Sequence, residues 1–379
     1  MSFTDRLGMT VQQVIAAWVL VLFVGGAAGV VAMLLCHYML TFGGDDSAEK
    51  HGISKVTATR VGGVAIVSYM LLHLGFQYYL GAYNPSVAEN AILLTAGAYF
   101  LLGIYEDLQG TLSARTRFAI MLFIALGALL SSPHLILAPV GIMGLDAALG
   151  FPVTAFLVTL MCVAFIPNAF NTADGANGLV SGIALMVMSG LTLAAPPSLI
   201  PFLSAGAVGC LIFLIFNLIS GRFFLGDGGA YFLGALCGLS VVIVSNGTDA
   251  NVWWLLALIF YPVADLIYSM ARRWGDGGSP LVPDNKHFHN LLFVWFDMGR
   301  SSSQTANTLC GVGIALVFSG LPLSLSMSGA LATDSSSWLW VVVLQWTAYL
   351  FGMRYLNQRL CLLPDDQESS ADALASEGA

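Results

Sequence analysis

The chain has 379 residues, of which 58% are hydrophobic and only 9% are charged, and its mean hydropathy is +0.83. Soluble domains carry about 25% charged residues, so this composition excludes a soluble globular protein and is typical of an integral membrane protein. The formal net charge is −8, and no basic or aromatic repeat suggests a nucleic-acid partner. The 6 cysteines form no CxxC pair, which argues against a zinc site or a disulfide frame.

Long apolar runs predict an all-α fold, because a helix needs about 20 apolar residues to cross the hydrocarbon core of a bilayer. The short alternating segments of a membrane β-barrel do not occur. The sequence predicts about eleven transmembrane helices, with ten as the lower count. Their approximate ranges are 13–40, 62–80, 88–104, 117–132, 151–168, 178–195, 200–219, 230–246, 251–273, 303–327 and 336–360. A kink is expected at Pro262, and the Gly-punctuated segment 134–149 is expected to form a short hairpin beside the membrane.

The basic residues predict the orientation. With eleven spans, every Lys and Arg except Arg6 falls on one side of the membrane. By the positive-inside rule that side is cytoplasmic, which places the N-terminus outside and the C-terminus inside. The predicted organisation is one polytopic membrane domain over 1–363, followed by a disordered acidic cytoplasmic tail over 364–379.

Polar stretches gather in the loops of the predicted cytoplasmic side. In the first, 54–63, Lys55 and Arg60 precede a glycine pair before a helix, an arrangement that suits a phosphate, although basic flanks of membrane helices are common. In the second, Glu106 and Asp107 end a span. Adjacent carboxylates are costly at a membrane boundary unless they are hydrated or bind a metal, so a general base or a metal site is favoured over a plain acidic helix end.

The third stretch, 168–179, packs Asn171, Asp174 and Asn177 beside two glycines. Glycine lets the backbone approach a ligand closely, and the amides and the carboxylate can ligate a cation or hydrogen-bond a polar head group. A hydrated loop between two membrane helices is the alternative interpretation. It is weakened by the presence of a further polar stretch of the same kind.

This fourth stretch runs from Asn217 to a helix start at Asp227-Gly-Gly. Backbone N–H groups there can face an anion while the Asp227 carboxylate holds a divalent cation. Phe224 can stack on a flat base, although a Phe beside a Gly-rich turn is more often part of the core.

The fifth stretch extends from Asp265 to Asn290. An ionisable residue within a span marks a functional site by default, although a hydrated helix kink would also account for Asp265. His287 and His289 follow Lys286 and can bind zinc or phosphate. Phosphate is favoured because no Cys or third His lies in the same loop.

In their order, these motifs resemble those of the polyprenyl-phosphate N-acetylhexosamine-1-phosphate transferases, the membrane family that includes WecA-like enzymes and the peptidoglycan enzyme MraY. The resemblance covers about residues 50–295 and rests on the stretches 59–63, 106–107, 168–179, 217–234 and 283–290. It implies that undecaprenyl phosphate attacks the β-phosphorus of a UDP-amino sugar, by default UDP-GlcNAc, and that UMP leaves. It also implies a need for Mg²⁺, with Mn²⁺ as an alternative.

The resemblance extends to individual residues. It implies a metal-binding role for Asp227 and catalytic roles for Asp107, Glu106 and Asp174. The residues expected to bind substrate are Lys55, Arg60, Asn171, Asn177, Asn217, Phe224, His287 and His289. The chain departs from the family pattern where Glu106 replaces an Asp, where Asn177 stands in the second acidic place of the central motif, and where Ala58-Thr59 stands in place of Thr-Pro.

The lack of a triple His favours the WecA-like branch, which initiates an O-antigen, a capsule or another surface glycan. The implied location is a bacterial inner membrane, and a homodimer is one possible assembly. Two other functions stay open. A transporter would place ionisable groups along a path between both faces, whereas here only Asp265 lies within a span. A catalytically inactive relative is the second, because Glu106 and Asn177 depart from the family pattern.

Overall fold

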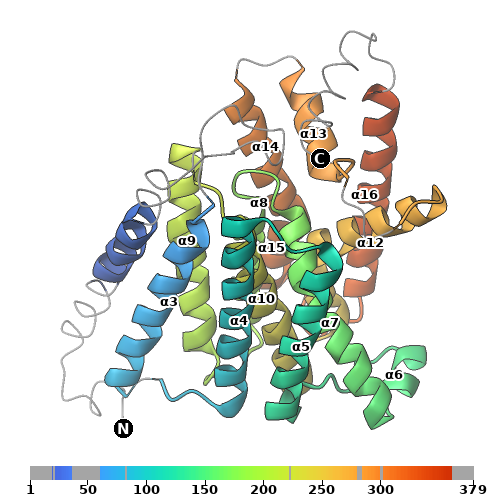
Figure 1. Ribbon diagram of the computed structural model, residues 1–379. Coiled ribbons are helices and arrows are strands. Elements are labelled where there is room, and N and C mark those ends of the chain that lie inside the picture. The colour runs from blue at the N-terminus through green and yellow to red at the C-terminus, as the bar shows by residue number, and fades with distance from the viewer. Residues whose placement is uncertain are drawn as a thin grey trace.

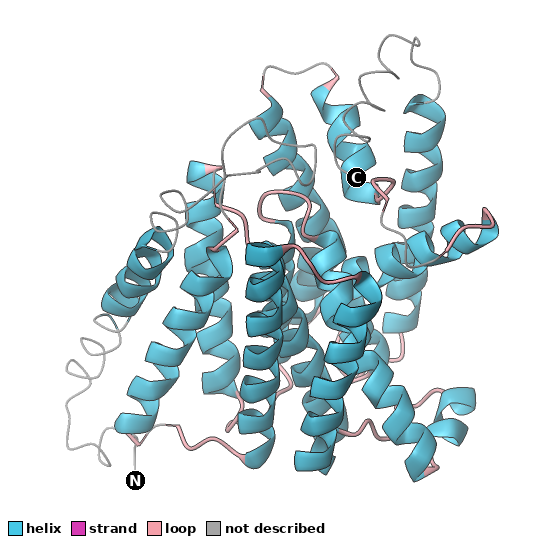
Figure 2. Ribbon diagram, in the orientation of Figure 1, coloured by secondary structure: helices cyan, strands magenta, loops and turns pink. Residues whose placement is uncertain are grey.

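The computed structural model describes residue 19 and residues 22–35, 60–81, 83–221, 223–279, 284–298 and 302–360. The elements within these ranges are helices (Figure 2). The first is a short apolar helix over Leu22–Leu35. The others are α3 (Gly62–Tyr79), α4 (Val87–Gln109), α5 (Ala114–Ser131), η1 (Pro133–Leu135), α6 (Met143–Leu149), α7 (Pro152–Ala173), α8 (Leu179–Leu191), α9 (Ile200–Ser220), α10 (Gly226–Gly247), α11 (Val252–Leu258), α12 (Phe260–Gly275), α13 (Phe288–Asp297), α14 (Ser303–Ala315), η2 (Leu316–Gly320), α15 (Leu321–Met327) and α16 (Trp338–Leu360).

Among the described residues, six helices are long and apolar enough to cross a membrane, or seven if the bent pair α11–α12 counts as one span. The six are α4, α5, α7, α9, α10 and the continuous segment Ser303–Met327. The all-α, multi-pass class is therefore confirmed, whereas the eleven predicted spans are not. Helix α8 illustrates the difference: it begins after Gly178, whose φ is +77°, and its 13 residues reach only about 20 Å at 1.5 Å per residue.

Helix α12 leaves the bundle sideways (Figure 1), because α11 and α12 meet at 81° across Ile259. The predicted kink at Pro262 therefore lies three residues earlier in the chain. Pro262 itself sits in the first turn of α12, where a missing backbone N–H breaks no helical hydrogen bond. The bend places the C-terminal turn of α12, with Arg272 and Arg273, outside the bundle.

The segment 134–149 folds back on itself instead of spanning a membrane. It contains η1 and the short helix α6, and the turn between them is closed by Asp146, which accepts hydrogen bonds from the backbone N–H groups of Val140 (2.6 Å) and Gly141 (3.0 Å). Gly141 adopts a φ of +87°, which favours glycine. This agrees with the hairpin expected from its glycines.

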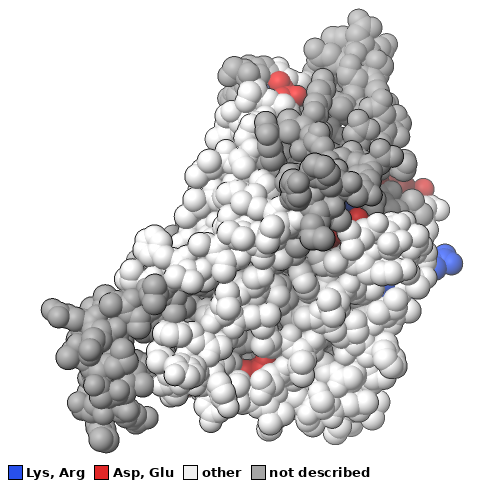
Figure 3. Space-filling view, turned by 60° about the vertical axis from the view of Figure 1, so that its left-hand side comes forward, with Lys and Arg blue, Asp and Glu red and all other residues white. Residues whose placement is uncertain are grey.

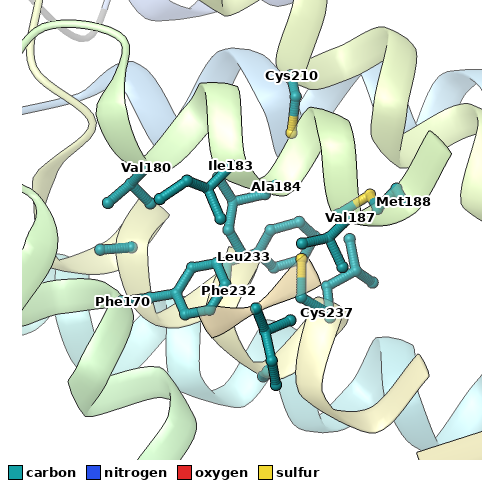
Figure 4. Packing of buried hydrophobic residues seen from close by; sticks show 14 of the residues in the cluster. Phe170, Val180, Ile183, Ala184, Val187, Met188, Cys210, Phe232, Leu233 and Cys237 are labelled. Atoms are coloured by element: carbon teal, nitrogen blue, oxygen red, sulfur yellow. The ribbon is translucent and has the colours of Figure 1, made fainter. Parts of the chain in front are cut away.

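Helix α10 lies at the centre of the bundle and is the most buried of the candidate spans. Of its 18-residue apolar stretch, 83% is buried inside the protein. Phe232 and Leu233 of α10 pack near Phe170 of α7 and Ile183 of α8 (Figure 4). On the α4 side the backbones touch, since a Cβ on Gly103 would collide with Gly228. The face of the protein that Figure 3 shows carries few charged residues.

Candidate active site

The start of α10 is the meeting point of three predicted polar stretches. The backbone N–H groups of Gly62 and Gly63 donate hydrogen bonds to the carbonyls of Phe224 (2.9 Å) and Leu225 (3.0 Å). These bonds tie the first polar stretch to the fourth. From α4, Asp107 Oδ2 accepts a hydrogen bond from the N–H of Gly228 at 3.1 Å, which adds the second stretch.

Asp107 and Glu106 face different partners, because consecutive residues on a helix point about 100° apart. Asp107 faces α10, and its Oδ1 atom is buried with no hydrogen-bond partner in the described part of the chain. Glu106 is 4% exposed and faces the α4–α5 turn, where Oε2 accepts the N–H of Leu112 at 3.1 Å. The two predicted catalytic carboxylates are therefore not equivalent, and Glu106 holds a turn.

Asp227 lies in the first turn of α10 with 15% of its side chain exposed. Its Oδ2 atom is 3.2 Å from Nη1 of Arg117, which also lies 3.5 Å from Oε1 of Glu106. Arg117 belongs to the first turn of α5. The sequence offered no signal for this contact beyond a basic residue after a span.

A cleft beside Asp227 has a free space of about 730 Å³, including the part that is open to solvent. The predicted residues that line it are Arg60, Asn171, Asp174, Asn177, Asn217, Phe224 and Asp227. These come from the first, third and fourth polar stretches, so the structure brings together most of the predicted substrate-binding residues. Lys55 lies outside the described residues, and Glu106, Asp107, His287 and His289 are not part of this lining.

Two asparagines in the cleft, Asn217 and Asn177, already form hydrogen bonds to other groups of the protein. Asn217 donates from Nδ2 to the carbonyl of Phe223 at 2.7 Å, and its Oδ1 atom is buried with no partner among the described residues. The backbone N–H of Asn177 donates to Oδ1 of Asn307 at 2.6 Å, and Asn177 Oδ1 is likewise buried and unpartnered within the described ranges. Asn307 comes from α14, far along the chain, and no motif pointed to it.

Asp174 ends α7 and faces the same cleft. Burial and, to a smaller extent, the negative charges of Asp227 and Asp107 raise the pKa of its carboxyl to about 8, against the opposing effect of Arg60. The ionised form of Asp174 is therefore disfavoured in this site unless a cation binds nearby.

The His-x-His pair, for which phosphate is the favoured ligand in the sequence, is buried. His287 Nδ1 lies 2.7 Å from Oδ2 of Asp265 and 3.1 Å from Oγ of Ser269, and its Nε2 lies 3.7 Å from Oδ1 of Asp284. The ring nitrogens of His287 therefore face carboxylates and a hydroxyl, and not the cleft. Asp265, the predicted intramembrane functional residue, is fully buried and anchors this loop.

His289 lies closer to the third polar stretch. Its Nδ1 atom is 3.0 Å from the hydroxyl of Tyr261, and its Nε2 faces Gly175 so closely that a Cβ on that glycine would collide with it. Glycine at 175 is thus required by the approach of a histidine ring from α13. His289 is the member of the pair that reaches the loop beside the cleft.

The described residues contain no group of three or more His, Cys, Asp or Glu side chains arranged to hold a metal ion. Magnesium does not need such a group, since one or two carboxylates suffice when substrate phosphates and water complete its coordination. Asp227 and the unpartnered Oδ1 of Asp107 satisfy that requirement in the chemistry of their atoms.

The fold and the site define a multi-pass membrane protein with a polar, acidic cleft at one end of its helical bundle. Residues 90–245 match Glycosyl transferase family 4. The match confirms, for this part of the chain, the resemblance inferred from the motifs. The matched region contains α10 up to residue 245 and three of the polar stretches.

Relatives with named activities are similar over much of the chain. A decaprenyl-phosphate N-acetylglucosaminephosphotransferase of Mycobacterium tuberculosis is 29% identical over 278 residues, covering 62% of this chain and 66% of the relative. Two undecaprenyl-phosphate alpha-N-acetylglucosaminyl 1-phosphate transferases also match. That of Thermotoga maritima is 27% identical (74% of this chain, 80% of the relative), and that of Escherichia coli K12 is 25% identical (61% and 64%). The chain thus spans just under two thirds of the length of the mycobacterial and E. coli relatives.

Proposed function

We propose that this protein transfers an amino-sugar-1-phosphate from a UDP-sugar to undecaprenyl phosphate or a similar polyprenyl phosphate. The products are the lipid-pyrophosphate-sugar and UMP. The names of the relatives support this reaction class and make GlcNAc the default sugar. The observation that carries the proposal is the position of Asp227, which lines the polar cleft and lies beside Asp107 at the start of the central helix.

The cleft suits the nucleotide half of the donor. A buried acceptor without a partner costs free energy until a ligand supplies a donor, and Asn217 Oδ1 is such an acceptor. The N3–H group of uracil is a suitable donor, and Phe224 offers an aromatic face in the same lining. These features support UDP as the carrier of the sugar phosphate.

A divalent cation fits the acidic end of the cleft. Asp227 and Asp107 would hold Mg²⁺, or Mn²⁺ in its place, because both are oxygen ligands and Asp107 Oδ1 is unpartnered in the described chain. When bound, the cation neutralises charge on the donor diphosphate during transfer. Asp174 contributes further negative charge to the same region.

The reaction needs mostly positioning. An oxygen of the acceptor phosphate forms a bond to the β-phosphorus, the bond from that phosphorus to the bridging oxygen breaks, and UMP leaves with the bridging oxygen. A phosphate monoester has its second pKa near 6, so the nucleophile is already largely ionised at about pH 7. The sugar C1–O bond stays intact, and the anomeric configuration is expected to be retained.

The site is expected at the cytoplasmic face of a bacterial inner membrane, because the basic loops lie on the same predicted side as the polar stretches. A lipid nucleophile then arrives within the bilayer, and the soluble nucleotide arrives from the cytoplasm. The WecA-like motifs favour the first membrane step of a surface glycan as the physiological role.

The test is UMP release by the purified protein with undecaprenyl phosphate, Mg²⁺ and a panel of UDP-amino sugars. UMP that depends on the lipid, from one donor, would establish the reaction and name the sugar. No UMP from any donor, in a preparation shown to be folded, would contradict the proposal and favour an inactive relative or a transporter.

A further inference from the structure

Arg117 reaches from α5 into the acidic cluster, although it is not among the cleft-lining residues. Its Nη1 atom lies 3.2 Å from Asp227 Oδ2 and 3.5 Å from Glu106 Oε1. The helix start that carries it is well defined, since Ser113 caps the first turn by accepting the N–H of Thr116 at 3.1 Å. Arg117 is therefore a positioned cation with 21% of its side chain exposed.

Asp227 lines the cleft and also contacts Arg117, which is not part of the lining. The cleft lining contains Arg60 and Asp174 but not Arg117. In phosphoryl transfer the attacking and leaving oxygens lie roughly in line on opposite sides of the phosphorus. If the nucleotide occupies the cleft, Arg117 lies outside the lining that the nucleotide contacts and is available to the attacking phosphate.

The helix that carries Arg117 is the least buried of the candidate spans. Only 22% of the 18-residue apolar stretch of α5 is buried, and two of its large side chains, Phe123 and Leu130, are 76% and 68% exposed. Figure 1 shows α5 on the outside of the bundle, beside α4 and α7. A lipid that lies along α5 would bring its head group to the first turn of this helix, where Arg117 stands.

We propose that Arg117 binds the phosphate of the acceptor lipid and that its contact with Asp227 belongs to the substrate-free protein. This inference rests on the proposed function. A guanidinium carries five N–H donors and pairs with phosphate through two parallel hydrogen bonds, and both contacts described above use Nη1 alone. When Asp227 binds a cation in place of Arg117, Glu106 still holds the Arg117 side chain close to the site. Glu106 therefore has a role in positioning Arg117.

The variants are Arg117→Gln, which removes the charge, and Arg117→Lys, which keeps the charge but loses the planar fork. Arg115→Gln is the matched control, because Arg115 is exposed on the same helical turn. Binding of farnesyl phosphate, of farnesol and of UDP to the full chain in detergent is measured by thermal shift and native mass spectrometry. These probes separate the acceptor phosphate from the apolar chain and from the donor.

Arg117→Gln is expected to weaken farnesyl phosphate binding by about 10- to 100-fold, the effect of losing charge-assisted hydrogen bonds. Arg117→Lys is expected to fall between this variant and the wild type. Binding of farnesol and UDP should change by less than about twofold, as should all binding to Arg115→Gln.

A second measurement, the affinity for Mn²⁺, should change in the opposite direction. Without substrates, Mn²⁺ as a paramagnetic probe should bind more tightly to Arg117→Gln than to the wild type, because the competing guanidinium beside Asp227 is gone. General damage to the fold would weaken both ligands, so weaker farnesyl phosphate binding together with tighter Mn²⁺ binding is specific to this inference.

Unchanged farnesyl phosphate binding in Arg117→Gln would overturn the inference, as would equal losses for farnesyl phosphate and UDP. A wild type that does not distinguish farnesyl phosphate from farnesol would also overturn it. Failure of the proposed reaction is visible separately. If no donor yields UMP while farnesyl phosphate binding still depends on Arg117, the phosphate site stands and the transferase proposal falls.

Discussion

Oδ2 of Asp265 lies 2.7 Å from Nδ1 of His287, although 22 positions separate the two residues. The same buried carboxylate accepts the N–H of Phe288 at 3.1 Å and the hydroxyl of Tyr349 at 2.8 Å. Asp265 therefore joins α12, the start of α13 and α16 at one point. Through α13 it fixes the place of His289 against Gly175 beside the cleft.

Asp265→Asn is expected to loosen this junction, because a buried charge-assisted hydrogen bond contributes about 1.5–3 kcal/mol. The thermal midpoint should fall, and KM for the UDP-sugar should rise while KM for the acceptor lipid stays the same. Tyr349→Phe, which removes one of the partners, should have a smaller effect in the same direction. Parallel increases in both KM values would contradict a role in positioning the His loop.

Asp227→Asn should abolish Mg²⁺-dependent turnover in a protein that remains folded, since the variant removes the cleft carboxylate best placed for the cation. The loss should reach at least about 10²-fold in kcat, typical of removing a group that neutralises transition-state charge. Asp276→Asn, at an exposed position after α12, is the control. Full activity of Asp227→Asn would exclude this residue as the metal ligand.

Asn177→Asp restores the acid that is usual in the family. Asn177 Oδ1 is buried without a partner in the described chain, so a carboxylate there would add charge near Asp174 and Asp227. The variant is expected to stay active and to need less Mg²⁺ for half-maximal rate, by about threefold to tenfold. Complete loss of activity, with Asn177→Ala still active, would mean that the site is built around a neutral side chain.

The pKa of Asp174 predicts a pH dependence in the cation-free protein. Its folded-state pKa of about 8 lies above the unfolded value of 3.8, so the folded protein holds a proton that the unfolded chain has released. The resulting stability is fully present below the unfolded pKa and is lost as the pH rises through the folded pKa, about 8.

In EDTA the thermal midpoint should therefore fall between pH 6 and pH 9, and Mg²⁺ should restore it most at the high end. The apparent affinity for Mg²⁺ should rise over the same range, because protons compete with the cation. Asp174→Asn should flatten both profiles relative to the wild type. A profile that Asp174→Asn leaves unchanged would assign the titration to another group.

Gly103→Ala should separate α4 from α10, because its Cβ would collide with the backbone of Gly228. Overpacking of this kind typically costs about 1–3 kcal/mol, and here it would also strain the hydrogen bond from Gly228 to Asp107. Gly97→Ala is the matched control on the same helix, with nothing within 4 Å of the added Cβ. The control should be neutral or slightly stabilising, and the thermal midpoints of the two variants distinguish these outcomes.

The sequence by itself determined the membrane class, the α-helical architecture and most of the cleft. Arg60, Asn171, Asp174, Asn217 and Asp227 were all identifiable because polar residues and glycines are costly at the ends of apolar helices unless they have a use. Short connections between neighbouring membrane helices bring such ends together, so residues far apart in sequence could be expected to meet.

Only the tertiary structure decided which groups point where. It separated Glu106 from Asp107, placed His287 against Asp265, and brought Arg117 beside Asp227. In the part of the chain that it describes, it also shows six or seven candidate spans, whereas hydropathy predicted eleven over the whole sequence. The physical reason is the same in each case. The direction of a side chain and the partners of an apolar run depend on how the helices pack. An apolar run has the same hydropathy whether it faces lipid or another helix.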